Sequence, residues 1–309
     1  MSDIEKNSEV KEIKSFSVKK EYKEKMGMSK KQKIGGILKT VLLFILAVIW
    51  LIPILWLLVT AFSAYPGMSR TRFFPERWTL ANFSRLFFHP DSILQYVRWF
   101  WNTLVIALFT CVISSVFVLM VSYAFSCMRF GGRKGLMTFS LILNMFPGVL
   151  SMIAVYFILK SLGLTNSHLG MIIVYSASSG LGYLIVKGYM DTIPMSLRES
   201  ARIEGANEYI IMTRVIMPIC KPIIVYQIIF SFLIPWGDFV LAKLMLNSGL
   251  SKDWTVAIGL YNMLDKALIN KYFSIFCAGG LIISVPISIL FILMQKFYIE
   301  GVSGGANKD

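Results

Sequence analysis

Few of the residue types that catalyse reactions or bind metals occur in this chain, and they show no functional spacing. Its only histidines are His89 and His168, and its cysteines form no CxxC pair, so no zinc-ligand pattern exists. Neither an HExxH motif nor a nucleotide-binding GxxxxGK(S/T) motif is present. The cysteines lie in or beside apolar runs, which is typical of free thiols that pack: Cys111, Cys127, Cys220 and Cys277. The sequence therefore predicts a protein that is not an enzyme and holds no metal or cofactor of its own.

The most polar segment in the second half of the chain runs from Arg198 to Pro222, between two strongly apolar runs. It carries charged side chains on both sides of a glycine, with two prolines at its exit: Glu199, Arg202, Glu204, Gly205, Glu208, Arg214, Pro218 and Pro222. Charged side chains at this density can form ion pairs and contact a partner protein. Two interpretations are open at this point: an ordinary polar loop between membrane spans, or a structured element that docks a partner.

Apolar residues dominate the composition and are gathered in long runs. Hydrophobic residues make up 56% of the 309 residues and charged residues 16%, with a mean hydropathy of +0.66. Soluble domains do not combine these values. Several runs exceed the roughly 20 residues that a helix needs to cross a bilayer, and they lack the alternation of a β-barrel strand. The sequence therefore predicts an all-α polytopic membrane protein with six transmembrane helices: Ile37–Phe62, Trp101–Met128, Leu136–Leu159, Leu169–Tyr189, Ile219–Leu246 and Tyr272–Phe297.

The distribution of basic residues predicts the orientation of these spans. The net charge of +14 would suggest nucleic acid in a soluble protein, but cytoplasmic loops of membrane proteins also collect Lys and Arg. Roughly two thirds of the 31 basic residues fall on the side of the N-terminal tail, although the first outer loop holds several arginines. Both termini and the polar loop 191–218 are therefore expected in the cytoplasm. The predicted regions are a lysine-rich tail (1–36), a first span with an extracytoplasmic loop (37–98), a core membrane domain (99–297) and a C-terminal tail (298–309).

The polar loop contains a spaced frame that resembles a known motif. Membrane subunits of ATP-binding-cassette (ABC) importers carry the pattern E-A-A, three residues, G, nine residues, I, one residue, L-P. The matching positions in this chain are Glu199, Ser200, Ala201, Gly205, Val215, Met217 and Pro218. Every spacing agrees, while Ser200, Val215 and Met217 replace the family's Ala, Ile and Leu. The chain is thus identified by resemblance as a permease subunit of this class.

The residues of this frame also predict its local structure. Residues 199–204 suit a short helix with Ala201 on the docked side, and Gly205 allows the backbone to turn and approach a partner closely. Residues 207–214 suit a second helix with Asn207 as its N-cap. In the family, such helices sit in a cleft on the ATP-binding subunit and transmit its opening and closing. The resemblance implies that role for the loop 191–218.

The C-terminus resembles the tail of the maltose-type (MalG-like) membrane subunits. The matching positions are Gly301, Ser303, Gly305 and Lys308, where Ser303 stands for the family's Thr. In that family the tail inserts between the ATP-binding subunits. The segment Trp254–Leu260 also resembles an outer-loop segment of the same subclass. These matches favour a carbohydrate importer over other members of the class.

The resemblance implies a fold, an activity and a set of partners. The fold would be that of type I (MetI-like) ABC importers, in the plasma or inner membrane of a bacterium or archaeon. The chain would form half of the path for a sugar, expected to be maltose, a malto-oligosaccharide or a related oligosaccharide. Its partners would be a second permease subunit, two ATP-binding subunits that hold the ATP, an extracytoplasmic substrate-binding protein and membrane lipid, with no nucleic acid. The alternatives are a permease for an amino sugar, glycerol phosphate or a polyol, and a standalone channel or secondary carrier.

Polar residues within the predicted spans are candidates for lining the substrate path. Asp238 is an acidic residue inside an apolar run, and such residues normally face a bundle interior or a cavity. It could equally cap a helix broken at Pro235–Gly237 or pair with a neighbouring subunit. Aromatic and polar side chains that suit a sugar are found in spans 3 to 5, where they could also serve helix packing: Asn144, Tyr175, Ser178, Gln227, Ser231 and Trp236.

Overall fold

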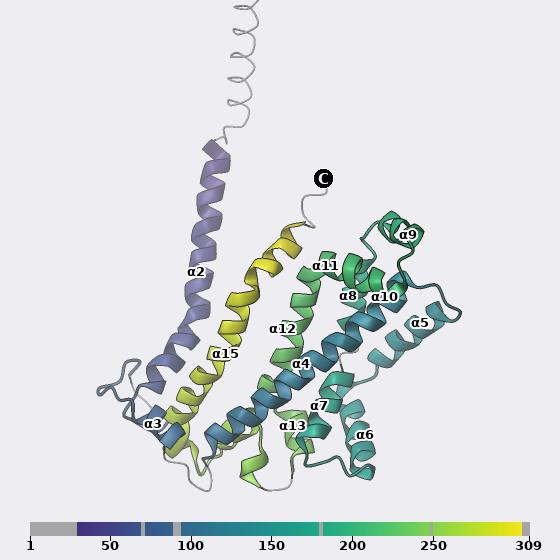
Figure 1. The fold of residues 1–309 in the computed structure, drawn as a ribbon. Coiled ribbons are helices and arrows are strands. Elements are labelled where there is room, and N and C mark those ends of the chain that lie inside the picture. The colour runs from purple at the N-terminus through teal and green to yellow at the C-terminus, as the bar shows by residue number, and fades with distance from the viewer. Residues whose placement is uncertain (1–29, 69–71, 89–93, 179–181, 248–249, 305–309) are drawn as a thin grey trace, which may run out of the picture. The chain divides into compact units, whose positions relative to one another are not determined.

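The computed structural model describes residues 30–68, 72–88, 94–178, 182–247 and 250–304 (Figure 1). In this part of the chain the backbone is helical, and the one strand-like pairing is an isolated bridge between Ser63 and Trp78. The chain divides into two compact units, Met1–Trp56 and Leu57–Asp309. The all-α prediction is confirmed for the described residues.

The first unit consists of most of helix α2 (Lys30–Ala61). Its stretch Ile34–Ala61 is long and apolar enough to cross a bilayer, and none of its most apolar window is buried inside the chain. Apolar residues lie on all sides of the helix rather than in one stripe, which is the pattern of a helix surrounded by lipid or by other proteins. This helix covers the predicted first span.

The second unit is built around α4 (Tyr96–Cys127), which contacts α12 (Lys221–Gly237), α7 (His168–Ala177) and α8 (Gly182–Met190). Helix α15 (Ile269–Gly304) lies beside α12 (Figure 1). The remaining helices are α3 (Ala81–Phe88), α5 (Arg133–Asn144), α6 (Gly148–Ser161), α9 (Met195–Ile203), α10 (Glu208–Ile210), η1 (Ile211–Ile216), α11 (Met217–Ile219), α13 (Val240–Met245), η2 (Ser251–Asp253) and α14 (Val256–Asn262).

The described helices allow up to six membrane spans, in agreement with the prediction. Three are long single helices: Ile34–Ala61, Tyr96–Cys127 and Ile269–Gln295. The other three are bent pairs. α5 and α6 meet at 100°, where Pro147 follows the end of α5, and α7 and α8 meet at 42°. An 85° bend before Lys221 sets α12 off from the preceding segment 208–219.

Two of the differences from the predicted boundaries have a clear physical reason. Helix α4 begins at Tyr96 rather than at Trp101, because Tyr96 and Trp99 are buried and extend the packed face by more than one turn. The predicted fifth span is divided into α12 and α13, since the chain is extended at Asp238. Hydropathy alone cannot locate the end of a helix, such as that of α12, when it follows three apolar turns.

The two ends of α4 are held by different parts of the chain. At its beginning, Trp99 packs flat over Gly259, whose added Cβ would lie 2.0 Å from the ring. Trp99 Nε1 also donates to the Ser251 carbonyl at 2.6 Å, and Asn102 Nδ2 donates to the carbonyls of Lys252 and Trp254. At its other end α4 contributes to an apolar cluster, here called the end cluster: Val118, Leu119, Tyr123, Cys127, Tyr183, Val186, Met190, Ile193, Ile211, Ile216 and Cys220.

Candidate functional site

The polar loop folds into two helices that are joined by a tight turn, residues 195–219, called here the helix–turn–helix segment. Helix α9 ends at Ile203, and the turn that follows contains a glycine in the left-handed conformation, Gly205, with φ +84°. The Gly205 N–H donates to the Arg202 carbonyl and the Ala206 N–H donates to the Ala201 carbonyl, both at 3.0 Å. These two bonds form a Schellman motif, which satisfies the last carbonyls of a helix and favours glycine. The turn predicted at Gly205 is confirmed.

The second helix begins at the predicted cap. Asn207 Oδ1 accepts a hydrogen bond from the Ile210 N–H at 2.9 Å. The helix continues through α10, the wider turn η1 and α11, so it extends beyond the predicted residue 214 and contains Pro218. It ends at Cys220, and α12 starts at Lys221 with Pro222 in its first turn. Proline in the first turn needs no backbone N–H, which permits a new helix to start there.

An ion pair joins the two helices of the segment. Arg202 donates from Nε and Nη2 to Glu208 Oε1 at 3.0 and 2.7 Å. The Tyr123 hydroxyl of α4 donates to Glu208 Oε2 at 2.6 Å. Both carboxylate oxygens of Glu208 are therefore satisfied, and Glu208 connects the segment to α4.

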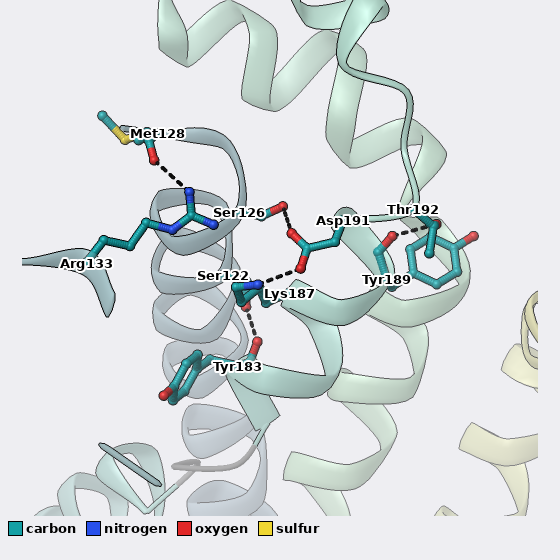
Figure 2. A network of polar contacts seen from close by, with 9 residues as sticks. All are labelled: Ser122, Ser126, Met128, Arg133, Tyr183, Lys187, Tyr189, Asp191 and Thr192. Carbon is teal, nitrogen blue, oxygen red and sulfur yellow. Dashed lines mark hydrogen bonds and ion pairs between the residues drawn. The ribbon is translucent and has the colours of Figure 1, made fainter. Parts of the chain in front are cut away.

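A second polar network lies just before the segment (Figure 2). The Asp191 carboxylate accepts hydrogen bonds from Ser126 of α4 at 2.6 Å and from Lys187 of α8. The Lys187 side chain is only 12% exposed, so its ammonium group is partly removed from water. Partial burial alone would raise the pKa of the Asp191 carboxyl, but the hydrogen bonds from Lys187 and Ser126 outweigh burial and hold this pKa below its ordinary value.

The residues of the predicted frame divide between two faces. Glu199, Ser200, Gly205 and Pro218 are exposed. Ala201, Val215 and Met217 are partly buried and pack against the end cluster. α9 turns the small side chain of Ala201 toward the end cluster, and the expectation that Ala201 lies on the docked side stays a prediction.

Two exposed apolar side chains beside Gly205 were not predicted from the sequence. Ile203 is 86% exposed and Tyr209 is 74% exposed. Apolar surface marks a protein contact where exposed side chains of this kind form one continuous patch. The available signal was the presence of an isoleucine and a tyrosine within an otherwise charged stretch, on either side of a glycine.

Most of the candidate path residues fall into two groups, and Asn144 and Ser178 stand apart from both. The Tyr175 hydroxyl donates to Asp238 Oδ2 at 2.8 Å, and Asp238 Oδ1 accepts from the Leu241 N–H, which caps α13. The capping alternative for Asp238 is thus observed. Asn144 is exposed, and its amide donates to the Ser140 carbonyl within its own helix. Exposed Ser178 at the end of α7 likewise bonds within its own helix.

The second group lies in the interface between α4 and α12. Gln227 Nε2 donates to Ser231 at 2.8 Å and to Ser114 of α4 at 3.3 Å, and all three residues are buried. Gly182 makes room for this glutamine, since an added Cβ would lie 2.8 Å from Gln227 Oε1. Within the described residues, Gln227 Oε1 and the indole N–H of buried Trp236 find no hydrogen-bond partner. Ser114 carried no sequence signal that separates it from other small residues of the spans, whereas Gly182 ends a run rich in small residues, 176–182, that is typical of close helix approach.

The predicted tail extends α15. Gly301 and Ser303 belong to this helix, which runs past Phe297 to Gly304, whereas Gly305 and Lys308 lie outside the described residues. The role of all four residues stays a prediction.

Comparison with known proteins identifies the family. The family described as "Binding-protein-dependent transport system inner membrane component" matches residues 128–302, more than half of the chain and the whole of the helix–turn–helix segment. The chain belongs to this family.

Curated relatives of the permease are sugar transporters. It is 36% identical over 268 residues to the galactooligosaccharides transport system permease protein GanQ of Bacillus subtilis (strain 168), covering 86% of this chain and 93% of that protein. It is 32% identical over 287 residues to the maltodextrin transport system permease protein MdxG of the same organism, covering 92% of this chain and 100% of that protein. A chain of a bacterial ABC transporter involved in the import of the acidic polysaccharide alginate shares its fold, with a TM-score of 0.70 and 23% identity over 88% of this chain and 99% of that one.

These findings establish the class of the protein. The permease is a MalG-like membrane subunit of a carbohydrate ABC importer and a multi-pass protein of the bacterial plasma membrane. Its relatives are transporter permeases rather than enzymes. A channel or secondary carrier is therefore excluded as the class of this chain.

Proposed function

We propose that the permease forms half of an import path for an oligosaccharide and receives the movement of ATP-binding partners through its helix–turn–helix segment. The observation that carries the proposal is the left-handed turn at Gly205, flanked by exposed Ile203 and Tyr209. Apart from its chain neighbours, no atom of the described residues lies within 4 Å of the position where a Gly205 Cβ would stand, so a partner can approach the backbone there. The excess of basic residues on this side of the spans supports its orientation toward the cytoplasm.

The chemistry of this surface fits a protein partner that buries protruding apolar side chains. Full burial of an isoleucine or tyrosine of this kind stabilises a contact by about 1.5–3 kcal/mol. The exposed frame residues Glu199, Ser200 and Pro218 would border the contact, while Ala201, Val215 and Met217 would hold the segment to the bundle. ATP can drive the cycle only if it binds better to one of the two conformations of the assembled transporter.

The proposed partners are a second, different permease subunit, two ATP-binding subunits and an extracytoplasmic substrate-binding protein. The described surface supports such an assembly because α5 has no buried residue and α6 buries only Leu159. An apolar helix pair of this kind needs lipid or another chain as its neighbour. The residues Gly301, Ser303, Gly305 and Lys308 are proposed to extend toward the ATP-binding subunits.

The substrate is proposed to be an oligosaccharide of the maltodextrin or galactooligosaccharide type, because relatives named for both classes match most of the chain. Sugars offer hydroxyl groups that donate and accept hydrogen bonds. Gln227 Oε1 and the Trp236 indole N–H are an acceptor and a donor without a partner in the described chain. We assign the path to the α12 side of the bundle, with contributions from Tyr175, Ser231 and Asp238, whereas roles for Asn144 of α5 and Ser178 at the end of α7 stay predictions.

Co-purification from membranes tests the coupling part of the proposal. Ile203→Asp and Tyr209→Ala should reduce the amount of ATP-binding subunit that co-purifies by about 10- to 100-fold, because apolar burial is lost. Phe88→Ala is the matched control, since Phe88 of α3 is 76% exposed and lies outside the segment. Unchanged co-purification of the Ile203 and Tyr209 variants would refute the docking surface.

Uptake measurements test the substrate class. Labelled maltotriose and a labelled galactotriose should enter vesicles that contain the complete transporter, and each should be displaced by unlabelled oligosaccharide. Uptake that is displaced by glycerol phosphate or a polyol but not by either oligosaccharide would overturn the assignment.

A further inference from the structure

Helix α4 carries two hydroxyl groups, one turn apart, that bind the two sides of α9. Tyr123 donates to Glu208 Oε2 and Ser126 donates to Asp191 Oδ1, each at 2.6 Å. Residues three positions apart lie on one face of a helix. Asp191 stands before α9 and Glu208 stands after it, so the two hydroxyls connect α4 to both ends of the first helix of the segment.

Both contacts are strengthened by a second, basic partner. Lys187 of α8 binds the Asp191 carboxylate, as Figure 2 shows, and Arg202 binds the Glu208 carboxylate. Hydrogen bonds to ionised acceptors are shorter and stronger than those between neutral groups. Ser122 adds a third contact from the same part of α4, donating to the backbone carbonyl of Tyr183 in α8 at 2.9 Å.

The end cluster fills the space beneath these polar contacts. Ile193, Ile211 and Ile216 of the loop region pack in one cluster with Val118 and Leu119 of α4. A close-packed interface transmits displacement rather than absorbing it. By contrast, α5 follows α4 in the chain without burying any residue, and it offers no packed route for the movement.

The opposite end of α4 is equally constrained. Trp99, Asn102 and Thr103 hydrogen-bond the segment 251–256, where Thr103 Oγ1 accepts from the Val256 N–H at 2.8 Å. The 32 residues of α4 span roughly 48 Å as an unbroken helix. The helix contains no proline or glycine that would allow a bend.

We propose that α4 acts as a rigid helix that transmits movement of the helix–turn–helix segment to the segment 251–256. Tyr123 and Ser126 are the positioning residues that attach α4 to the helix–turn–helix segment. This inference rests on the proposed coupling function of the segment. When the segment turns, the two hydroxyls pull on successive turns of α4, so α4 moves as one body. The far end of α4 then shifts the loop that precedes α14.

The test removes the two hydroxyls and little else. A Tyr123→Phe/Ser126→Ala double variant is placed in the complete transporter in proteoliposomes, and the sugar transported per ATP hydrolysed is measured. We expect wild-type co-purification of the ATP-binding subunits and at least a fivefold fall in this ratio, with smaller falls for each single change. Tyr156→Phe/Ser161→Ala is the matched control, because it removes two hydroxyls from α6, outside the end cluster, and should leave the ratio unchanged.

A second variant guards against a folding defect. Asp191→Asn keeps the volume of the side chain and removes its charge, and it should lower the same ratio while co-purification of the ATP-binding subunits stays at the wild-type level. A ratio within twofold of wild type in the double variant overturns the proposal. So does a fall that merely parallels a loss of assembled complex or of the unfolding midpoint, which would show that these residues only hold the fold.

The outcome separates this inference from the function on which it rests. Failure of the α4 proposal alone leaves co-purification and its dependence on Ile203 intact. Failure of the coupling function itself abolishes co-purification with the wild-type chain, and it overturns both.

Discussion

The conformation of Gly205 leads to a prediction that tests one contribution to stability, the backbone conformational energy of the turn. Its φ of +84° is unfavourable for residues with a Cβ, and an added Cβ would meet no other atom within 4 Å in the described part of the chain. Gly205→Ala should therefore destabilise the turn by about 1–2 kcal/mol through the backbone alone. Gly205→Asn should cost less, because asparagine tolerates the left-handed region, and Gly205→Val should cost more because its side chain is β-branched.

Gly188 provides the matched control for this series. It lies within α8 and also has no atom near the position of an added Cβ, but it has no left-handed backbone. Gly188→Ala should therefore stabilise its helix by about 0.5–1 kcal/mol. The two alanine variants differ in the sign of their effect for a single reason, the backbone dihedral angle.

Hydrogen exchange of the purified permease in detergent measures the effect locally. The N–H groups of Gly205 and Ala206 close the turn on α9, so their exchange reports its opening. Gly205→Ala should speed exchange of these amides by about 5- to 30-fold, while Gly188→Ala leaves them unchanged. Equal exchange in the two variants, or a valine variant no faster than the alanine variant, would refute the reasoning.

Three further predictions concern other parts of the chain. Gly259→Ala should lower the midpoint of thermal unfolding in detergent, at a cost of at least about 1–3 kcal/mol, because the new methyl group would clash with the Trp99 ring. Gly280→Ala is the control: its methyl group has room, so the midpoint should stay unchanged. Asn82→Ala should cost about 1–3 kcal/mol in the same assay, since its amide donates to two carbonyl oxygens at 2.9 and 2.8 Å in a buried site. Because the pKa of Asp191 is lowered in the fold, its ionised carboxylate stabilises the protein above the ordinary carboxyl pKa, and this stabilisation is lost as the pH falls through the lowered value. The unfolding midpoint of the wild type should therefore approach that of Asp191→Asn only in acid. A loss of the difference between pH 6 and 8 would contradict this.

Much of the helix–turn–helix segment could be predicted because its signals are local. The glycine at the left-handed turn, the asparagine cap and the proline in the first turn of α12 each act within a few residues of the chain. The spans were predictable for a related reason, since a bilayer requires long apolar helices whatever their neighbours. Hydropathy could not place the break at Asp238, because that break depends on a cap and on the hydroxyl of Tyr175 from another helix.

The rotation of each helix about its axis was decided only by tertiary packing. Ala201 faces inward and Ile203 outward because α9 rests on the end cluster, and the sequence of α9 gives no reason to prefer this over the reverse. The contacts of α4 with Asp191 and Glu208 join residues 65 and 85 positions apart. Composition and spacing by themselves determined that this chain crosses a membrane and has a segment suited to a partner. Which side chains that segment presents, and which helix it is attached to, follow from how the helices pack.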